Sequence, residues 1–352
     1  MIHSIFILSA LLVSFLLTLV IMPYGIRLFI KWGLGKNIRS EGLVGKAKEF
    51  EKLHSKKKGT PNMGGALMIF TVILVVLLSI GTQILSKYTF EKYGFGFQNS
   101  LWNRKETYLV IFTLVTVGII GFVDDYLNVK EIGRTKGLSA RVKMICLILF
   151  SLMGAYWFYV KLGYSSVNLP FFGDIQISIF YVFLFVLVVI SAANSVNLTD
   201  GLDGLAGGLL LFQYLAYGGI TYMQGTYILS AFCMIIAGTL MAFLWFNIHP
   251  AQIFMGDVGS LSLGATLAII ALMTDTLLAF IIMSSVFIAE TISVMMQTTS
   301  KKMRNGKKIF RIAPFHHHLE AIGWQEETIV MRLWILGIVS AIVGIIVAIM
   351  GA

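Results

Sequence analysis

Charged residues are scarce in this chain. They make up 12% of its 352 residues, whereas a soluble domain of this size carries roughly a quarter. Hydrophobic residues reach 57%, and the mean hydropathy is +0.85. Apolar runs of about 20 residues, the length of helix that crosses a bilayer, recur along the chain. The composition excludes an ordinary soluble domain and predicts an all-α integral membrane protein.

Cysteine and proline are also rare. The two cysteines, Cys146 and Cys233, fall inside apolar runs, so no disulfide framework is expected. The five prolines lie at or near the ends of these runs, as expected for residues that interrupt helices. The first run lacks a basic leading segment and a small-residue cleavage pattern, which favours a retained span over a removed signal peptide. No repeat divides the chain, so residues 1–352 are interpreted as a single polytopic membrane domain.

The apolar runs predict about ten transmembrane helices. They cover residues 4–26, 63–83, 107–123, 144–161, 175–193, 204–222, 226–246, 259–274, 276–296 and 330–350. Of the 27 Lys and Arg residues, 22 follow the first, third and ninth runs. Basic residues mark cytoplasmic loops, which places the odd-numbered loops inside and both termini outside. Only Thr274 and Asp275 separate the eighth and ninth runs, so a single re-entrant hairpin there would change the count.

The polar motifs all fall in the odd-numbered loops. The first is DDYLN at 124–128. On a helix, Asp124 and Asn128 share a face, while Asp125 is rotated by about 100°. Adjacent carboxylates repel unless a cation or a basic group lies near them. Mg²⁺ would serve, because proteins hold it with one or two carboxylates together with substrate phosphates. The alternative is a solvated helix end.

The motif NSVNLTDGLDGLAGG at 194–208 has a polar residue at every third position: Asn194, Asn197, Asp200 and Asp203. An aspartate here can cap the following helix. Capping accounts for one aspartate, but not for the second or for two asparagines at membrane depth. Polar side chains in such positions face a cavity or one another, which indicates a functional site.

Two further motifs contribute an acid and a run of histidines. In FNIHPAQIFMGDVGS, 246–260, Asp257 lies between Gly256 and Gly259, just before a predicted apolar helix. It is interpreted either as a metal ligand or as an ordinary N-cap. Phe254 offers a surface for a flat ring, or an interfacial anchor. FRIAPFHHHLE, 310–320, holds His316, His317 and His318. Successive histidines suit contacts with phosphate better than one zinc site, and a surface loop is the alternative.

Basic loops adjoin the membrane at SKKKGTPNMGG, 55–65, and at Lys130–Lys143. These loops would serve equally well to keep the positive charge inside and attract anionic lipid, or to bind an anionic substrate. No nucleic acid partner is expected.

Glu290, inside the ninth run, is either functional or a local partner that holds helices together.

The motifs gather acids, glycine turns, histidines and basic loops on one predicted cytoplasmic face. This combination predicts Mg²⁺-assisted chemistry on a phosphate-bearing substrate, with one substrate embedded in the lipid bilayer. The competing class is an ion-coupled transporter. Its acids would cluster near the bilayer midplane, often in two related halves, whereas these lie at the ends of spans.

The four motifs, with KKGTPNMGG at 57–65 and TKGL at 135–138, resemble those of the polyprenyl-phosphate sugar-1-phosphate transferase family. The resemblance covers nearly the whole chain, in order. It implies transfer of phospho-MurNAc-pentapeptide from UDP-MurNAc-pentapeptide to undecaprenyl phosphate, with Mg²⁺, release of UMP and a location in the bacterial inner membrane. Transfer of GlcNAc-1-phosphate to the same lipid is the alternative, which the triple histidine disfavours. The resemblance is compatible with a homodimer.

The resemblance also assigns roles to residues of this chain. Asp124, Asp125, Asp257 and His316 match catalytic positions, with Asp257 as the metal ligand. Positions that match substrate contacts are Lys58, Thr60, Asn128, Lys136, Asn194, Asn197, Asp200, Asp203, Asn247, Phe254, His317 and His318. The stretch LNVKEIGR, 127–134, departs from the usual pattern, so Lys130, Arg134 and Lys136 compete for one basic role and Lys136 is preferred. Because an alkyl phosphate is already largely ionised at neutral pH, direct attack by the lipid phosphate is favoured over a covalent enzyme intermediate.

Overall fold

The computed structural model describes residues 2–35, 41–42, 45–46, 57, 59–93, 101, 105–132, 137–170 and 172–351. Lys58, Arg134 and Lys136 lie outside these described residues. The helices are α1 Ile2–Lys31, α3 Gly64–Tyr93, α4 Lys105–Val129, α5 Ala140–Tyr156, α6 Phe180–Thr199, α7 Leu205–Met223, α8 Tyr227–Asn247, α9 Gly256–Met273, α10 Leu277–Met283, α11 Ser285–Met303, α12 Phe315–Ala321 and α13 Glu326–Met350. A π-helical turn, Trp157–Lys161, extends α5.

Two short antiparallel hairpins accompany the helices. One pairs β1, Glu41–Gly42, with β2, Gly45–Lys46, and the other pairs β3, Ser166–Leu169, with β4, Gly173–Gln176. The second hairpin corrects the start of the fifth predicted run. Residues 173–176 form β4, and the helix begins only at Phe180.

Within the described part of the chain, eight helices are long and apolar enough to cross a membrane: α1, α3, α4, α5 with its extension, α6, α8, α9 and α13. The pair α10 and α11 is bent by 70° and makes a ninth if it is counted as one span. The bend falls at Ser284, inside the ninth predicted run, and not at Thr274–Asp275. The all-α membrane class is therefore confirmed. The count of ten, which includes α7, and the external termini stay predictions.

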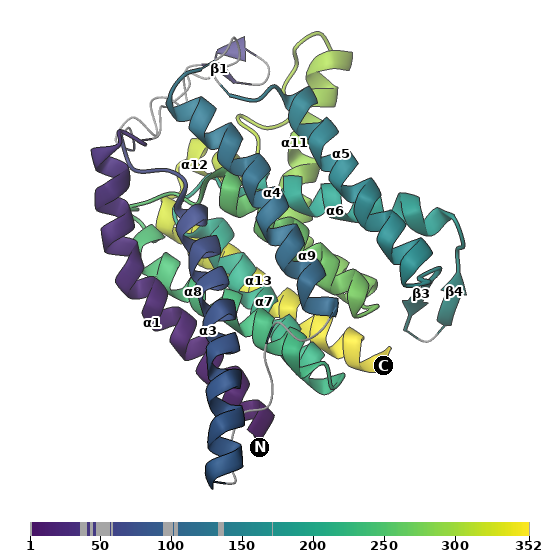
Figure 1. Cartoon of the computed structure of the whole chain (residues 1–352). Helices are drawn as coiled ribbons and strands as arrows, with labels where there is room; N and C mark the ends of the chain where they lie inside the picture. The colour runs from purple at the N-terminus through teal and green to yellow at the C-terminus, as the bar shows by residue number, and fades with distance from the viewer. Residues whose placement is uncertain are drawn as a thin grey trace.

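Helix α9 forms the centre of the bundle. Every residue from Val258 to Leu272 is buried, with α4 and α6 packed against it. Helices α1 and α7 pack on α8 instead. Large apolar side chains such as Leu8 on α1 and Ile335 on α13 are more than half exposed, as expected for faces that meet lipid. In Figure 1 both termini lie towards the lower side, whereas β1 and α12 lie towards the upper side.

Candidate functional site

An acidic cluster forms where α4 ends beside the beginning of α9. Asp124 and Asp125 lie in the last turns of α4, and Asp257 lies in the first turn of α9. The two helices approach closely at Gly121, where a Cβ atom would overlap the backbone carbonyl of Asp257. A residue without a side chain at this position therefore brings all three carboxylates to one place.

Asp257 does not cap its helix. The N-cap of α9 is Met255, which makes no side-chain capping hydrogen bond. The interpretation of Asp257 as an ordinary N-cap is therefore wrong, and its carboxylate is available for other contacts. Gly256, at φ 75°, turns the chain into the helix, a backbone conformation that favours glycine.

Lys143, in the first turns of α5, joins two of the three aspartates. Its Nζ forms ion pairs with Asp124 and Asp257. Asn197, near the end of α6, donates from Nδ2 to Asp257 Oδ1 at 2.7 Å. Asp124 Oδ1 accepts from the backbone N–H of Leu138 at 2.7 Å. Four helices thus hold one cluster, and two carboxylates converge on a single positive charge.

The role of Lys143 was missed in the sequence, where Lys136 was preferred within the same basic run. A signal was present. Ser139 precedes the apolar run, and its hydroxyl accepts from the Val142 N–H at 3.3 Å, which caps α5. A serine cap fixes the start of a helix and therefore places Lys143 in its first turns, next to the site. Lys130, another candidate, donates instead to Trp32 O at 2.9 Å.

A second polar cluster surrounds Asp203. Lys57 Nζ lies 2.7 Å from Asp203 Oδ1 and 2.5 Å from Glu326 Oε1. His249 Nδ1 lies 2.9 Å from Asp203 Oδ2, and the Asp203 N–H donates to Glu326 Oε1 at 2.7 Å. Asp203, His249 and Glu326 could together hold a metal ion, and the Lys57 ammonium lies between two of their carboxylates, as Lys143 does in the first cluster. Because these residues are far apart in the sequence, no local pattern predicted this cluster.

Asp203 does not cap the helix that follows it. The N-cap of α7 is Gly204, at φ 80°, and no side-chain hydrogen bond caps this end. The capping expected from an aspartate of this motif is therefore not observed. Asn247 holds the same turn, since it accepts from the Gly204 N–H at 3.0 Å and donates to Ile253 O at 2.8 Å.

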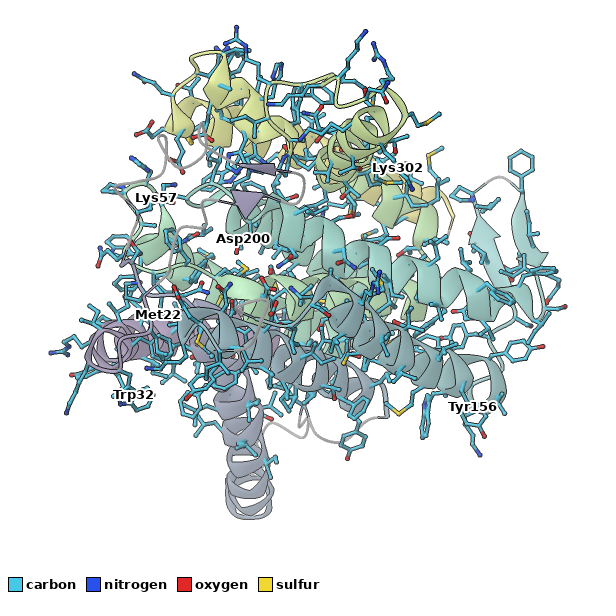
Figure 2. The ribbon with its side chains drawn as sticks, turned by 90° about the horizontal axis from the view of Figure 1, so that it is seen from above. Met22, Trp32, Lys57, Tyr156, Asp200 and Lys302 are labelled. Atoms are coloured by element: carbon cyan, nitrogen blue, oxygen red, sulfur yellow. The ribbon has the colours of Figure 1, made fainter. Side chains whose placement is uncertain are left out.

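The remaining predicted contact residues differ in burial and in hydrogen-bond partners. Asn194 donates to Ile190 O, one turn back in α6, at 2.8 Å. Phe254 is 9% exposed, so little of its ring is open to a ligand. Thr60, Asn128 and Asp200 are half-buried. Figure 2 views this end of the bundle from above, with Lys57 and Asp200 labelled.

The histidine run forms α12, which packs on α11. His316 is fully buried, and its backbone N–H donates to Glu290 Oε2 at 3.2 Å. Its ring Nδ1 lies 3.1 Å from the same oxygen, without the alignment of a hydrogen bond. His317 Nδ1 lies 2.6 Å from Glu320 Oε2, and His318 Nδ1 accepts from the Arg311 N–H at 3.3 Å. Glu290 is thus a local partner that fixes the start of α12.

An apolar cavity of about 230 Å³ lies between α6, α9, α10 and α11. It is lined mainly by aliphatic and aromatic side chains, including Leu184, Leu267 and Phe287. Its lining extends along α6 to Ser195 and Val196, next to Asn197 of the acidic cluster. The lining of the cavity thus reaches the residues of α6 that precede Asn197 in the sequence.

Comparison with known proteins identifies the family. Residues 107–275 match the family described as Glycosyl transferase family 4. The chain is 35% identical over 338 residues to the phospho-N-acetylmuramoyl-pentapeptide-transferase of Geobacillus sp. (strain WCH70), covering 96% of each chain. It is 39% identical over 340 residues to that of Dichelobacter nodosus, covering 91% of this chain and 86% of the relative. The helical membrane fold and these matches over nearly the full length show that the chain belongs to the phospho-N-acetylmuramoyl-pentapeptide-transferase family.

Proposed function

We propose that this protein transfers phospho-MurNAc-pentapeptide from UDP-MurNAc-pentapeptide to undecaprenyl phosphate, producing lipid I and UMP in peptidoglycan synthesis. The observation that carries the proposal is the joint ion pairing of Lys143 with Asp124 and Asp257 at one end of a bundle of apolar helices. Such a cluster suits phosphate chemistry at the surface of a membrane. The names of the relatives supply the identity of the transferred group.

Mg²⁺ fits the acidic cluster. Carboxylate oxygens are its preferred ligands, and those of Asp124 and Asp257 already converge on one ammonium group. When bound, Mg²⁺ neutralises charge that develops on the phosphates. The Asp257 side chain is 24% exposed and that of Asp203 only 2%, which favours Asp257 over the second cluster as the metal ligand. The region shared with the family, 107–275, also contains Asp257 but not Lys57 or Glu326.

The apolar cavity suits a segment of the polyprenyl chain of the lipid substrate. Residues of α6 line it as far as Val196, next to Asn197 in the sequence. Asn197 donates a hydrogen bond to Asp257. A lipid whose chain occupies this cavity would present its phosphate to the acidic cluster. The nucleotide sugar would approach from the aqueous side of the membrane. The basic loops predict that this side is the cytoplasmic face of the bacterial inner membrane.

The reaction requires one bond to form and one to break. An oxygen of the lipid phosphate attacks the phosphorus that carries the sugar, and the bond from this phosphorus to the bridging oxygen of UMP breaks. Lys143 places positive charge beside the phosphates, and Asn197 orients Asp257. Both oxygens of Asp125 accept hydrogen bonds, and Asp124 contacts Lys143 and Leu138. These contacts favour direct attack over a covalent aspartyl phosphate, and trapping such an intermediate would contradict it.

The test is UMP release by the purified protein with undecaprenyl phosphate and Mg²⁺. UDP-MurNAc-pentapeptide and UDP-GlcNAc are compared as donors. Release with the first alone, abolished by Asp257→Ala, supports the proposal and the metal ligand. Release with UDP-GlcNAc would instead assign the activity of a GlcNAc-1-phosphate transferase. No release with either donor, from protein shown to be folded, would overturn the proposal and favour transport.

A further inference from the structure

The two adjacent aspartates of α4 occupy different environments. Asp124 takes part in the ion pair with Lys143. Asp125 is 3% exposed, and each of its carboxylate oxygens accepts a hydrogen bond. Oδ1 accepts from Asn62 Nδ2 at 2.9 Å, and Oδ2 accepts from the backbone N–H of Val258 at 3.0 Å. Asp125 therefore faces the protein and holds the first turn of α9.

Asn62 is itself held rigidly. It is 5% exposed, and its backbone N–H donates to Leu34 O at 2.9 Å. The neighbouring Pro61 O accepts from the Phe254 N–H at 2.8 Å, and the Gly64 N–H donates to Phe254 O at 2.8 Å. The segment that carries Asn62 thus lies alongside the residues that lead into α9.

The packing between these groups leaves no spare room. A Cβ atom on Gly256 would overlap Asp125 Oδ2 and would lie 2.9 Å from Asn62 Oδ1. Asn62 Oδ1 has no hydrogen-bond partner among the described residues, although it is buried. An unpaired buried acceptor is unfavourable, so packing alone is a poor reason for an asparagine here. What the side chain provides is its donor contact with Asp125.

We propose that Asn62 is a positioning residue for the metal-binding aspartate. Asn62 fixes the carboxylate of Asp125, and Asp125 accepts from the Val258 N–H in the first turn of α9. Asp257, the residue before Val258, lies in the same turn. The inference rests on the proposed function, because it assigns the purpose of the turn to Mg²⁺ and phosphate binding. Partners that orient a metal ligand are typically worth about 10- to 100-fold in metal affinity or activity.

The test replaces Asn62 with leucine, which has a similar size but no donor. In Asn62→Leu we expect kcat for UMP release and the apparent Mg²⁺ affinity each to fall by about 10- to 100-fold. The KM for UDP-MurNAc-pentapeptide should stay near the wild-type value, while the melting temperature without Mg²⁺ should fall by a few degrees, because the buried Asp125 Oδ1 loses its donor. Asn62→Ser, which retains a shorter donor, should recover part of the loss. A second readout is the Mg²⁺-induced rise in melting temperature, which requires no turnover.

The hairpin provides a matched control. Asn168 Nδ2 donates to Asp174 Oδ1 at 3.0 Å, the same chemistry between β3 and β4. Asn168→Leu should change neither kcat nor the Mg²⁺ response. Wild-type kcat and Mg²⁺ response in Asn62→Leu would overturn the inference. Equal losses in kcat, in Mg²⁺ affinity and in the affinity for UDP-MurNAc-pentapeptide, together with a lower melting temperature, would also overturn it, because they mark a purely structural role. Wild-type protein that releases no UMP would contradict the proposed function, while the Mg²⁺-induced melting shift would still decide the role of Asn62.

Discussion

Lys143 and Asp257 lie 114 residues apart in the sequence and form an ion pair between the starts of α5 and α9. The same ammonium contacts Asp124 at the end of α4. This relationship joins the three helices α4, α5 and α9 at the acidic cluster. It is therefore the contact whose removal should affect the reaction most directly.

Replacing Lys143 with methionine should reduce UMP release by about 10²–10³-fold, because a positive charge aimed at the reacting phosphates is lost. The measurement is kcat for UMP release in detergent. Lys130→Met is the matched control, because the Lys130 ammonium donates to a backbone carbonyl, Trp32 O, and forms no ion pair among the described residues. Equal losses in the two variants would show that general basic charge, and not the ion pair, supports activity.

Replacing Glu290 with leucine should loosen α12 from α11. The hydrogen bond from the His316 N–H to Glu290 has a charged acceptor, and its loss costs about 1.5–3 kcal/mol. Arg304, Lys307 and Arg311 are exposed in the segment that leads to α12, so trypsin cleavage there should accelerate about tenfold or more.

The control for this experiment is Glu290→Gln, which retains an acceptor oxygen for the His316 N–H. It should be cleaved at nearly the wild-type rate. If leucine and glutamine variants are cleaved equally fast, the negative charge of Glu290, and not its hydrogen bond to the backbone, holds the segment.

Replacing Gly201 with alanine should disturb the histidines without removing them. A Cβ atom at this position would overlap His316 Nε2 and would lie 3.0 Å from His317 Nε2. Overpacking of this kind costs about 1–3 kcal/mol and displaces the rings. We expect lower kcat with a small loss of melting temperature. Gly219→Ala is the control, because no atom lies within 4 Å of its added Cβ. Unchanged activity in Gly201→Ala would argue against a role for the position of these rings.

Filling the apolar cavity should impair use of the lipid substrate selectively. Ser191→Trp places a large side chain in its lining. The KM for undecaprenyl phosphate should rise about tenfold, equivalent to about 1.4 kcal/mol of lost apolar contact, while the KM for UDP-MurNAc-pentapeptide stays unchanged. A polyprenyl phosphate with a shorter chain should be less affected.

Leu152→Trp, on an exposed part of α5 outside this cavity, is the control for the tryptophan itself. If both variants raise the KM for the lipid equally, the bulky residue acts through the surrounding detergent or lipid. The polyprenyl chain would then bind elsewhere.

The helical elements could be predicted from the sequence because apolar runs near 20 residues have few stable alternatives in a membrane. Each of the ten predicted runs corresponds to a helix or, in the ninth, to the bent pair α10 and α11. The bend at Ser284 was not predicted, although Ser284 and Ser285 form a serine pair inside the apolar run, a feature at which helices often kink. The β3–β4 hairpin was also missed, since four-residue strands carry too short a pattern.

Within the acidic cluster, the sequence pointed to Asp124, Asp125 and Asp257 through their position at the ends of spans. It did not distinguish the two neighbours in α4. Their opposite orientations follow from packing: Asp124 meets Lys143, whereas Asp125 is enclosed by Asn62 and the first turn of α9. Lys143 was overlooked because a basic loop beside a membrane has an adequate explanation in membrane topology alone.

The sequence by itself determined the membrane class, the helical segments and the family, because these depend on local hydropathy and on ordered motifs. The tertiary structure decided which charges meet. Ion pairs such as Lys143 with Asp257, and Lys57 with Asp203, join residues more than a hundred positions apart. They form only after glycine-mediated helix packing has brought the ends of α4, α6 and α9 together. Local sequence carries little information about such distant contacts, since their geometry depends on the packing of the whole bundle.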